Sequence, residues 1–368
     1  MLEMALKNSE HLKEDDPKLL DLYDSLGDTL AKAGNEKKAE EYLVKALKLR
    51  SASQTKDELL LFRSMIYLGT LYRDQNRFTE SEELYKKAMA TYTKTGPLAA
   101  VFQATALTAL GTMYVQMSRP VEAEMLLRKA LEMRKTASQI VGPSDAIYDA
   151  LGRALESQDK FAEAEKVLTE AVAISEKESS PETHALSQIN LAVVYSDLGK
   201  YKEARELINK ATKTIEAKRG LRSPSTATCY SNLASVAIDQ DQYGAAEALL
   251  NKALSIHEEA LGKDNASVAY DLLKLMAIYR NQGQYTKAQE TGERSIAIFK
   301  KTLGVDSIAT AKAMSRLADL YVNQLRFDDA DKLAQEVIRV LADKLGSESV
   351  EYAIGLLLAA EVSYGKHN

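Results

Sequence analysis

Four polar residues recur at one position of a regular sequence pattern. Each directly precedes a leucine, and neighbouring members of the series are 42 residues apart: Asn190, Asn232, Lys274 and Arg316. An asparagine side chain can both donate and accept hydrogen bonds, so it can hold the backbone of an extended peptide, whereas lysine and arginine pair with carboxylates. The series therefore has the chemistry of a binding surface.

Two more basic residues extend the series at its C-terminal end. Lys312 lies one helical turn before Arg316, and we place Arg280 on the same side as Lys274. This part of the surface is therefore expected to be basic and to favour carboxylate ligands. The alternative is that Arg316 pairs with Asp319 and that these charges form ordinary solvated surface, where an ion pair contributes about 0–1 kcal/mol.

Three aspartates give the N-terminal end the opposite sign. Asp21, Asp24 and Asp28 have the spacing i, i+3, i+7, which places their side chains on one face of a helix. We therefore expect a surface that is acidic at one end and basic at the other. Such a surface would select the direction of its ligand by charge.

Residue types found in catalytic and metal centres are present but are not grouped. The histidines lie in different parts of the chain without the paired spacing of a metal site: His11, His184, His257 and His367. The sequence contains no Gly-rich phosphate loop, no HExxH and no Gly-x-Ser-x-Gly segment. Cys229 has no histidine nearby in sequence, and we interpret it as a small packed residue. We therefore expect no enzyme activity, no metal and no cofactor.

The composition is that of a soluble folded protein. Of 368 residues, 45% are hydrophobic and 27% charged, and only 6 are proline. The formal net charge of −5 argues against a nucleic-acid partner, which normally requires a basic surface. No signal peptide and no long apolar run occurs, so we expect no membrane association. The single cysteine excludes an internal disulfide and fits either a reducing compartment or indifference to redox state, and we expect the protein in the cytoplasm.

The whole chain is built on an internal repeat. A leucine, which we call the repeat leucine, recurs at Leu26, Leu68, Leu110, Leu151, Leu191, Leu233, Leu275 and Leu317. A small residue thirteen positions later recurs at Ala39, Ser81, Ala123, Ala164, Ala204, Ala246, Ala288 and Ala330. Both series have the steps 42, 42, 41, 40, 42, 42 and 42. Repetition at such a period is typical of a solenoid.

Small residues after the repeat leucine predict close contact between two helices in every repeat. They are Gly27, Gly69, Gly111, Gly152, Ala192, Ala234 and Ala318. Without a large side chain the two helix backbones can approach each other, as in an antiparallel helical hairpin. The seventh repeat has Met276 here and Gly292 where most repeats have a leucine, which predicts an exchange of large for small across the hairpin. Because glycine lowers helix stability by about 1 kcal/mol relative to alanine, this repeat is also expected to be soft.

We therefore predict an all-α, right-handed α-solenoid of eight helical hairpins, with half-repeats at both ends. The hairpins occupy residues 16–346, an N-terminal half-repeat helix residues 1–15, and a C-terminal capping helix residues 347–368. A chain that begins inside a hairpin suggests either a piece of a longer protein or a truncated cap. We expect the array to be a monomer.

The repeat resembles the tetratricopeptide repeat, in an unusually long form that is similar to the array of kinesin light chains. The likeness rests on exits such as Leu261-Gly262 and Leu303-Gly304, and on the segments Ile189–Ala192 and Ser231–Ala234. In that family the asparagines of the Asn-Leu-Ala motif line a peptide groove, and Asn190 and Asn232 match the motif. Lys274 and Arg316 depart from it, which implies a different ligand preference. The coiled coil that joins kinesin light chains to their motor is not found, so their transport role is not implied.

In stacked hairpins of this type the first helices form the inner, concave wall. We therefore expect a non-catalytic scaffold or adaptor that binds a peptide or helical segment of another protein in the groove. The alternative is a sensory or regulatory module that changes the shape of its superhelix on binding a peptide signal and so controls an effector. An enzyme would need chemistry from an additional N-terminal region.

Overall fold

The computed structural model describes residues 12–13, 16–32, 35–53, 57–93, 95–136, 145–347 and 349–367. All regular secondary structure within these residues is helical. The helices are α2 (Pro17–Lys32), α3 (Glu36–Ala52), α4 (Glu58–Asp74), α5 (Phe78–Thr91), α6 (Pro97–Gln116), α7 (Pro120–Thr136), α8 (Asp145–Glu156), α9 (Phe161–Glu178), α10 (Pro181–Asp197), α11 (Tyr201–Arg219), α12 (Pro224–Ile238), α13 (Tyr243–Leu261), α14 (Ala266–Asn281), α15 (Tyr285–Thr302), α16 (Ile308–Asn323), α17 (Phe327–Leu345) and α18 (Val350–His367).

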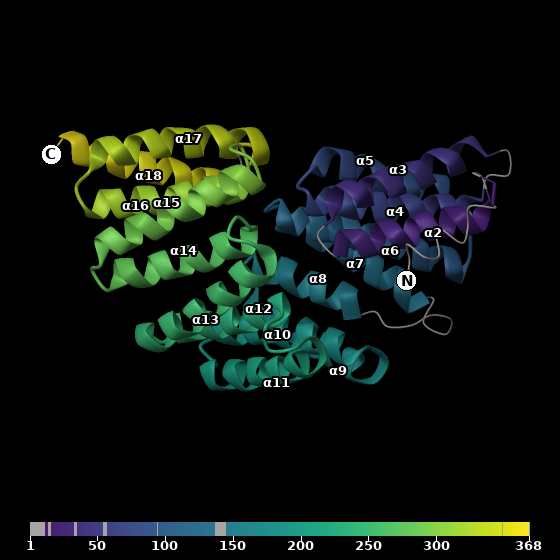
Figure 1. Cartoon of the computed structure of the whole chain (residues 1–368), viewed down its shortest axis with the longest axis horizontal. Coiled ribbons are helices and arrows are strands. Elements are labelled where there is room, and N and C mark those ends of the chain that lie inside the picture. The colour runs from purple at the N-terminus through teal and green to yellow at the C-terminus, as the bar shows by residue number, and fades with distance from the viewer. Residues whose placement is uncertain are drawn as a thin grey trace. The chain divides into compact units, whose positions relative to one another are not determined.

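Consecutive helices pack as hairpins, which confirms the predicted solenoid of helical pairs (Figure 1). The even-numbered helix of each pair contains the repeat leucine, and we call it the first helix; the odd-numbered partner is the second helix. Second helices also contact the first helix of the following hairpin, as α11 contacts α12 and α13 contacts α14. The chain forms two compact units, residues 1–116 with 120–151, and residues 117–119 with 152–368. We call the second of these unit 2, and its first helices carry the candidate binding face.

Many helices begin at caps that the sequence provides. Ser180, Ser223 and Ser307 precede α10, α12 and α16, and each accepts a hydrogen bond at Oγ from the backbone N–H three residues later, at 3.1, 3.2 and 3.1 Å. Pro181 and Pro224 occupy the first helical position, where the missing N–H leaves no hydrogen bond unmade. These caps fix where each first helix starts, and therefore which of its residues share a face.

The hairpin contact is made by the small residue after the repeat leucine, as expected. A Cβ atom added to Gly111 would lie 2.7 Å from Cγ of Leu127, and one added to Gly69 would lie 2.7 Å from Cε1 of Tyr85. In both hairpins the partner is sixteen residues further along the chain. Glycine is required here because the facing large side chain occupies the space of any Cβ.

In the seventh hairpin the two sizes are exchanged, which confirms the prediction for Met276 and Gly292. A Cβ on residue 292 would lie 2.7 Å from Sδ of Met276 and 3.3 Å from its Cε. The separation is again sixteen residues, so the methionine of α14 fills the space that a leucine of the second helix fills elsewhere. The contact volume is kept although the glycine lies inside α15.

First helices lie on the inner side of each unit. In the first unit α2 contacts α4 and α4 contacts α6; in unit 2 α10 contacts α12, α12 contacts α14 and α16 contacts α18. Between successive second helices of the described chain there is no comparable set of contacts. Helices that approach more closely lie on the concave side of a curved stack, so the first helices of unit 2 form an inner face.

One helix, α6, is long and apolar enough to cross a membrane by length and composition alone. Half of the residues in its most apolar window are buried, and it packs against α7 in the same way as the other hairpins. Such burial is typical of a core helix, and we interpret α6 as one.

At the C-terminal end α18 follows the last hairpin and packs on α17 and α16. The predicted N-terminal half-repeat helix of residues 1–15 lies outside the described residues, apart from Leu12 and Lys13.

Candidate ligand-binding face

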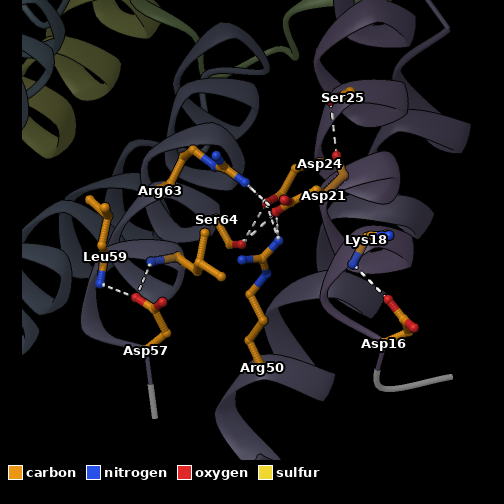
Figure 2. Close-up of polar contacts among 11 residues, drawn as sticks. Asp16, Lys18, Asp21, Asp24, Ser25, Arg50, Asp57, Leu59, Arg63 and Ser64 are labelled. Atoms are coloured by element: carbon orange, nitrogen blue, oxygen red, sulfur yellow. Dashed lines mark hydrogen bonds and ion pairs between the residues drawn. The ribbon is translucent and has the colours of Figure 1, made fainter. Parts of the chain in front are cut away.

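The N-terminal aspartates do not form the acidic end that the sequence predicted, because two of them are neutralised between helices (Figure 2). Asp24 is only 1% exposed, accepts a hydrogen bond from Ser64 Oγ at 2.9 Å and pairs with Arg50 at 3.0 Å. Asp21 pairs with Arg50 at 2.7 Å and with Arg63. The prediction was therefore wrong for Asp24, whose carboxylate is enclosed where α2, α3 and α4 meet.

Burial is also the main cause of the raised pKa of Asp24, which Arg50 and Ser64 partly offset. Asp28 is half-buried and has interaction partners of its own. None of the three aspartates is thus an uncommitted charge awaiting a ligand.

Lys274, in α14, is held by its own array. Its Nζ donates a hydrogen bond to the backbone oxygen of Ser231 in α12 at 3.0 Å. Burial lowers the pKa of Lys274, and the nearby carboxylates Asp271 and Asp239 act in the opposite direction. The lysine therefore braces α14 against α12, and its predicted place among the carboxylate-binding residues of the groove stays a prediction.

Arg280 and Arg316, both predicted to face the groove, lie on α14 and α16. Together with Leu273, Met276 and Ala277 they line a small, partly open hollow between α14 and α16. Neither arginine makes an ion pair with the residues that the structure describes. Two guanidinium groups beside an apolar wall provide charge-assisted donors for a carboxylate and contact area for the carbons that carry it.

Asp319 is an acidic residue that interacts electrostatically with both Arg280 and Arg316. Its pKa is raised chiefly by burial, while Arg280 and Arg316 lower it and Glu361 raises it. Arg316 and Asp319 form no direct ion pair among the described contacts. The two side chains influence each other only electrostatically, so the structure does not contain the alternative Arg316–Asp319 pair. The hollow therefore retains donors for a ligand.

The remaining predicted residues are divided between the inner face and the scaffold. Asn190 and Asn232 are both half-buried on α10 and α12. Asn232 makes no hydrogen bond within the described chain, whereas Asn190 has partners. Lys312 pairs with Glu351 of α18 at 3.1 Å, so it links two first helices.

Three apolar residues of the inner face were missed by the sequence reasoning. Leu186 and Val193 lie on α10, one turn on either side of Asn190, and are 54% and 37% exposed. Tyr270 of α14 has the same repeat position as Leu186, five residues before the repeat leucine, and is 52% exposed. Most other repeats have polar residues there, such as Thr228, and the fourth has Ala146. This difference between repeats could have identified the apolar surface from the sequence, because exposed large apolar side chains on a shared face mark contact surfaces.

A row of carboxylates was also missed. Glu156, Asp197 and Asp239 lie at the C-terminal ends of α8, α10 and α12, where the helix dipole already disfavours negative charge. Burial raises the pKa of Glu156, and Asp197 raises it further; burial and then Asp239 raise the pKa of Asp197. Asp239 accepts a hydrogen bond from Ser196 Oγ at 2.7 Å. These carboxylates make the α8–α12 side of unit 2 acidic.

Stacked helical hairpins with an inner face of polar and apolar side chains define the class of helical-repeat binding proteins. Family comparison assigns the repeat type. The tetratricopeptide repeat matches residues 19–94, 60–136, 182–259 and 269–343, and a second model of the same repeat matches residues 146–185. The matched segments cover more than half of the chain, which therefore belongs to the tetratricopeptide repeat family.

Solved structures share this fold. A Rap protein complexed with competence and sporulation factor is 15% identical, with a TM-score of 0.59 over 95% of this chain and 98% of that one. Aspartyl phosphate phosphatase F from Bacillus subtilis is 13% identical, with a TM-score of 0.51 over 96% of this chain and 95% of that one. A chain from Podosopora anserina, described as a kinesin light chain with nearly identical TPR-like repeats, is 25% identical, with a TM-score of 0.42 over 53% of this chain and 93% of that one. No curated protein sequence matches this chain.

Proposed function

We propose that this protein is a non-catalytic interaction scaffold that binds a linear peptide, or a helical segment of a partner protein, on the inner face of unit 2. We further propose that it acts in the cytoplasm. The observation that carries the proposal is the hollow between α14 and α16, in which Arg280 and Arg316 adjoin Leu273 and Met276. An acidic side chain or a terminal carboxylate on an apolar stem would satisfy both parts of this hollow.

The rest of the inner face supports a ligand that is longer than one residue. The side-chain amide of Asn232 makes no hydrogen bond to the described residues. Asn232 lies on α12, one repeat before the hollow. Leu186 and Tyr270 add exposed apolar area on either side of it. Amides that can bind a peptide backbone, together with apolar contact points, are the usual components of a peptide-binding groove.

The test is selection of binders from a display library of random twelve-residue peptides, followed by calorimetric measurement of affinity. We expect the double substitution Arg280→Glu/Arg316→Glu to weaken the selected peptides about tenfold or more, because charge-assisted hydrogen bonds become repulsive contacts. Lys213→Glu/Lys218→Glu is the matched control: it makes the same change of charge at two exposed lysines of the second helix α11 that form no ion pair with the described residues. Equal loss in both variants, or no loss in either, would contradict the proposal.

A regulatory module is the second candidate, in which peptide binding changes the shape of the array and controls an effector. It is suggested by the match to a Rap protein complexed with competence and sporulation factor, a match that extends over 95% of this chain. Small-angle scattering with a selected peptide distinguishes the two. A regulatory module should become measurably more compact when the peptide is bound, whereas a rigid scaffold should keep its radius of gyration.

A further inference from the structure

We infer that the inner face of unit 2 selects an extended segment whose charges are separated: a cationic end on α8, α10 and α12, and an anionic end in the hollow between α14 and α16. This inference rests on the proposed function and adds the chemical nature of the ligand. It places the acidic end of the face in unit 2 itself, where the sequence had placed it on α2.

The repeat positions show that both ends lie on one face. Glu156 and Arg280 each follow their repeat leucine by five residues, and Asp197 follows its own by six. Because Arg280 lines a hollow on the first helices, the equivalent position of α8 lies on the same side of the stack. One structural position therefore has opposite charges three repeats apart.

The charged groups form a continuous series of electrostatic neighbours. Besides burial, Asp197 raises the pKa of Glu156, which Arg153 lowers, and Asp239 raises the pKa of Asp197. Asp239 and Arg316 both act on Lys274. The sign of the charge changes at Lys274, whose hydrogen bond to the Ser231 carbonyl fixes it in the wall between the two ends. Neither Glu156 nor Asp197 makes an ion pair with any described residue, so their charges, like those of the two arginines, are left for a ligand to neutralise.

Geometry sets the length of the segment. Packed neighbouring helices lie about 8–10 Å apart, so α10 and α14, two repeats apart, are separated by about 16–20 Å. An extended chain advances about 3.3 Å per residue. Roughly five or six residues thus connect a cation beside Asp197 with a carboxylate beside Arg280. The exposed side chain of Val193, one turn before Asp197 on α10, lies beside this path and fits an apolar residue of the segment.

The arginine hollow is an observation independent of the carboxylate row. It is a partly open hollow lined by two arginines and an apolar wall, and this lining favours an anion whether or not the acidic residues are charged. The carboxylates add the second recognition element. A uniformly acidic peptide would be repelled from α8–α12, and a uniformly basic one from the hollow, so only separated charges match the whole face.

Two display libraries of twelve-residue peptides test this inference. In one, lysines are fixed at positions 3 and 4 and aspartates at positions 9 and 10, so that the nearest opposite charges are five residues, about 16 Å, apart; in the other, the same four residues alternate at the centre, and eight positions are random in both. We expect clones with separated charges to be enriched on the wild-type protein and to bind about tenfold more tightly than clones with alternating charges. This advantage should shrink at high salt, because exposed charges are screened within about 8 Å even at physiological ionic strength.

Protein variants then assign the cationic end. Glu156→Gln/Asp197→Asn should abolish the preference for separated charges without a change in fold, because both substitutions keep shape and remove charge. Glu170→Gln/Glu206→Gln, on the exposed surfaces of α9 and α11, is the matched control and should keep the preference.

Equal affinity of the two peptide classes, with binding still lost in Arg280→Glu/Arg316→Glu, would overturn the inference and leave the proposed function intact. Peptides that bind but are unaffected by the arginine substitutions, or the absence of any selected peptide, would overturn both. A preference that persists in Glu156→Gln/Asp197→Asn would also overturn the inference.

Discussion

Met276 and Gly292 show how tightly a single pair of residues determines the hairpin contact. Elsewhere the small residue belongs to the first helix and the large one to the second, as in Gly111 and Leu127. In the seventh repeat the sulfur of Met276 enters the space above Gly292, 2.7 Å from where a Cβ would be. The effects of substituting Met276 and Gly292 on the free energy of unfolding should therefore be coupled rather than additive.

We expect Gly292→Leu alone to lower the free energy of unfolding by about 1–3 kcal/mol, because the leucine would overlap Met276. Adding Met276→Ala, which recreates the common pattern, should recover most of the loss, and a double-mutant cycle in urea should give strong positive coupling. Gly244→Leu is the control, since a Cβ on this helical glycine meets nothing within 4 Å. Additive effects would show that the two residues do not share the contact.

Glu156 makes a different residue-scale prediction, which concerns pH. Its pKa is raised by burial and by Asp197, so the folded protein binds this proton more tightly than the unfolded chain does. The group therefore destabilises the fold above its raised pKa, and this penalty disappears as the pH falls below the unfolded value of about 4.3. Glu156→Gln should raise the free energy of unfolding at pH 7 and change it much less near pH 4. An equal effect at both pH values would contradict this assignment.

At the scale of elements, junctions between hairpins are built in two ways. The junction of α12, α13 and α14 contains Ser231, His257 and Asp271, all buried; His257 Nδ1 lies 2.7 Å from the Asp271 carboxylate, to which Ser231 Oγ also donates. One repeat earlier, Ile189, Ile215 and Cys229 occupy the same positions and pack as an apolar cluster. The polar set satisfies itself, with His257 Nε2 also 3.2 Å from the Pro224 carbonyl.

Removing one member of the polar junction should be worse than removing all three. We expect Asp271→Ala to lower the free energy of unfolding by about 3–5 kcal/mol, because it leaves His257 and Ser231 buried without their acceptor. The triple variant Ser231→Ile/His257→Ile/Asp271→Cys copies the apolar junction of the preceding repeat and should recover most of that loss. Chemical denaturation measures both. A triple variant that is less stable than Asp271→Ala would show that the two junctions are not interchangeable.

The same junctions explain why the sequence predicted the elements better than the site. The leucine and alanine series determined the hairpins because they lie at fixed positions along each helix. Asp24 shared a helix face with Asp21, but whether it met solvent depended on Arg50 and Ser64 of the next helices. Likewise the ammonium group of Lys274 donates a hydrogen bond to a backbone carbonyl of α12. No pattern of side chains in the sequence could predict this contact. Partners from neighbouring helices decide which polar residues remain free.

At the scale of the whole molecule, the main helix contacts among the described residues join hairpins that are neighbours along the chain, so stability should be close to a sum over repeats and their interfaces. A fragment of residues 179–368 retains the hairpins from α10 to α17 and the last helix α18. We expect it to fold alone with helical circular dichroism, to unfold cooperatively in urea, and to keep the arginine hollow. A fragment without helical signal would show that this part of the chain depends on what precedes it.

The two kinds of junction also bear on how an array like this one can change its length. Unequal crossing-over that removed the hairpin of α12 and α13 would bring α14 directly after α11, with Asp271 facing Ile189 and Ile215. A carboxylate enclosed by isoleucines without a cation would be strongly unfavourable. A whole repeat can therefore be gained or lost where the junctions on both sides are apolar. The repeat that carries Ser231 and His257 must instead be inherited together with the following repeat, which carries Asp271.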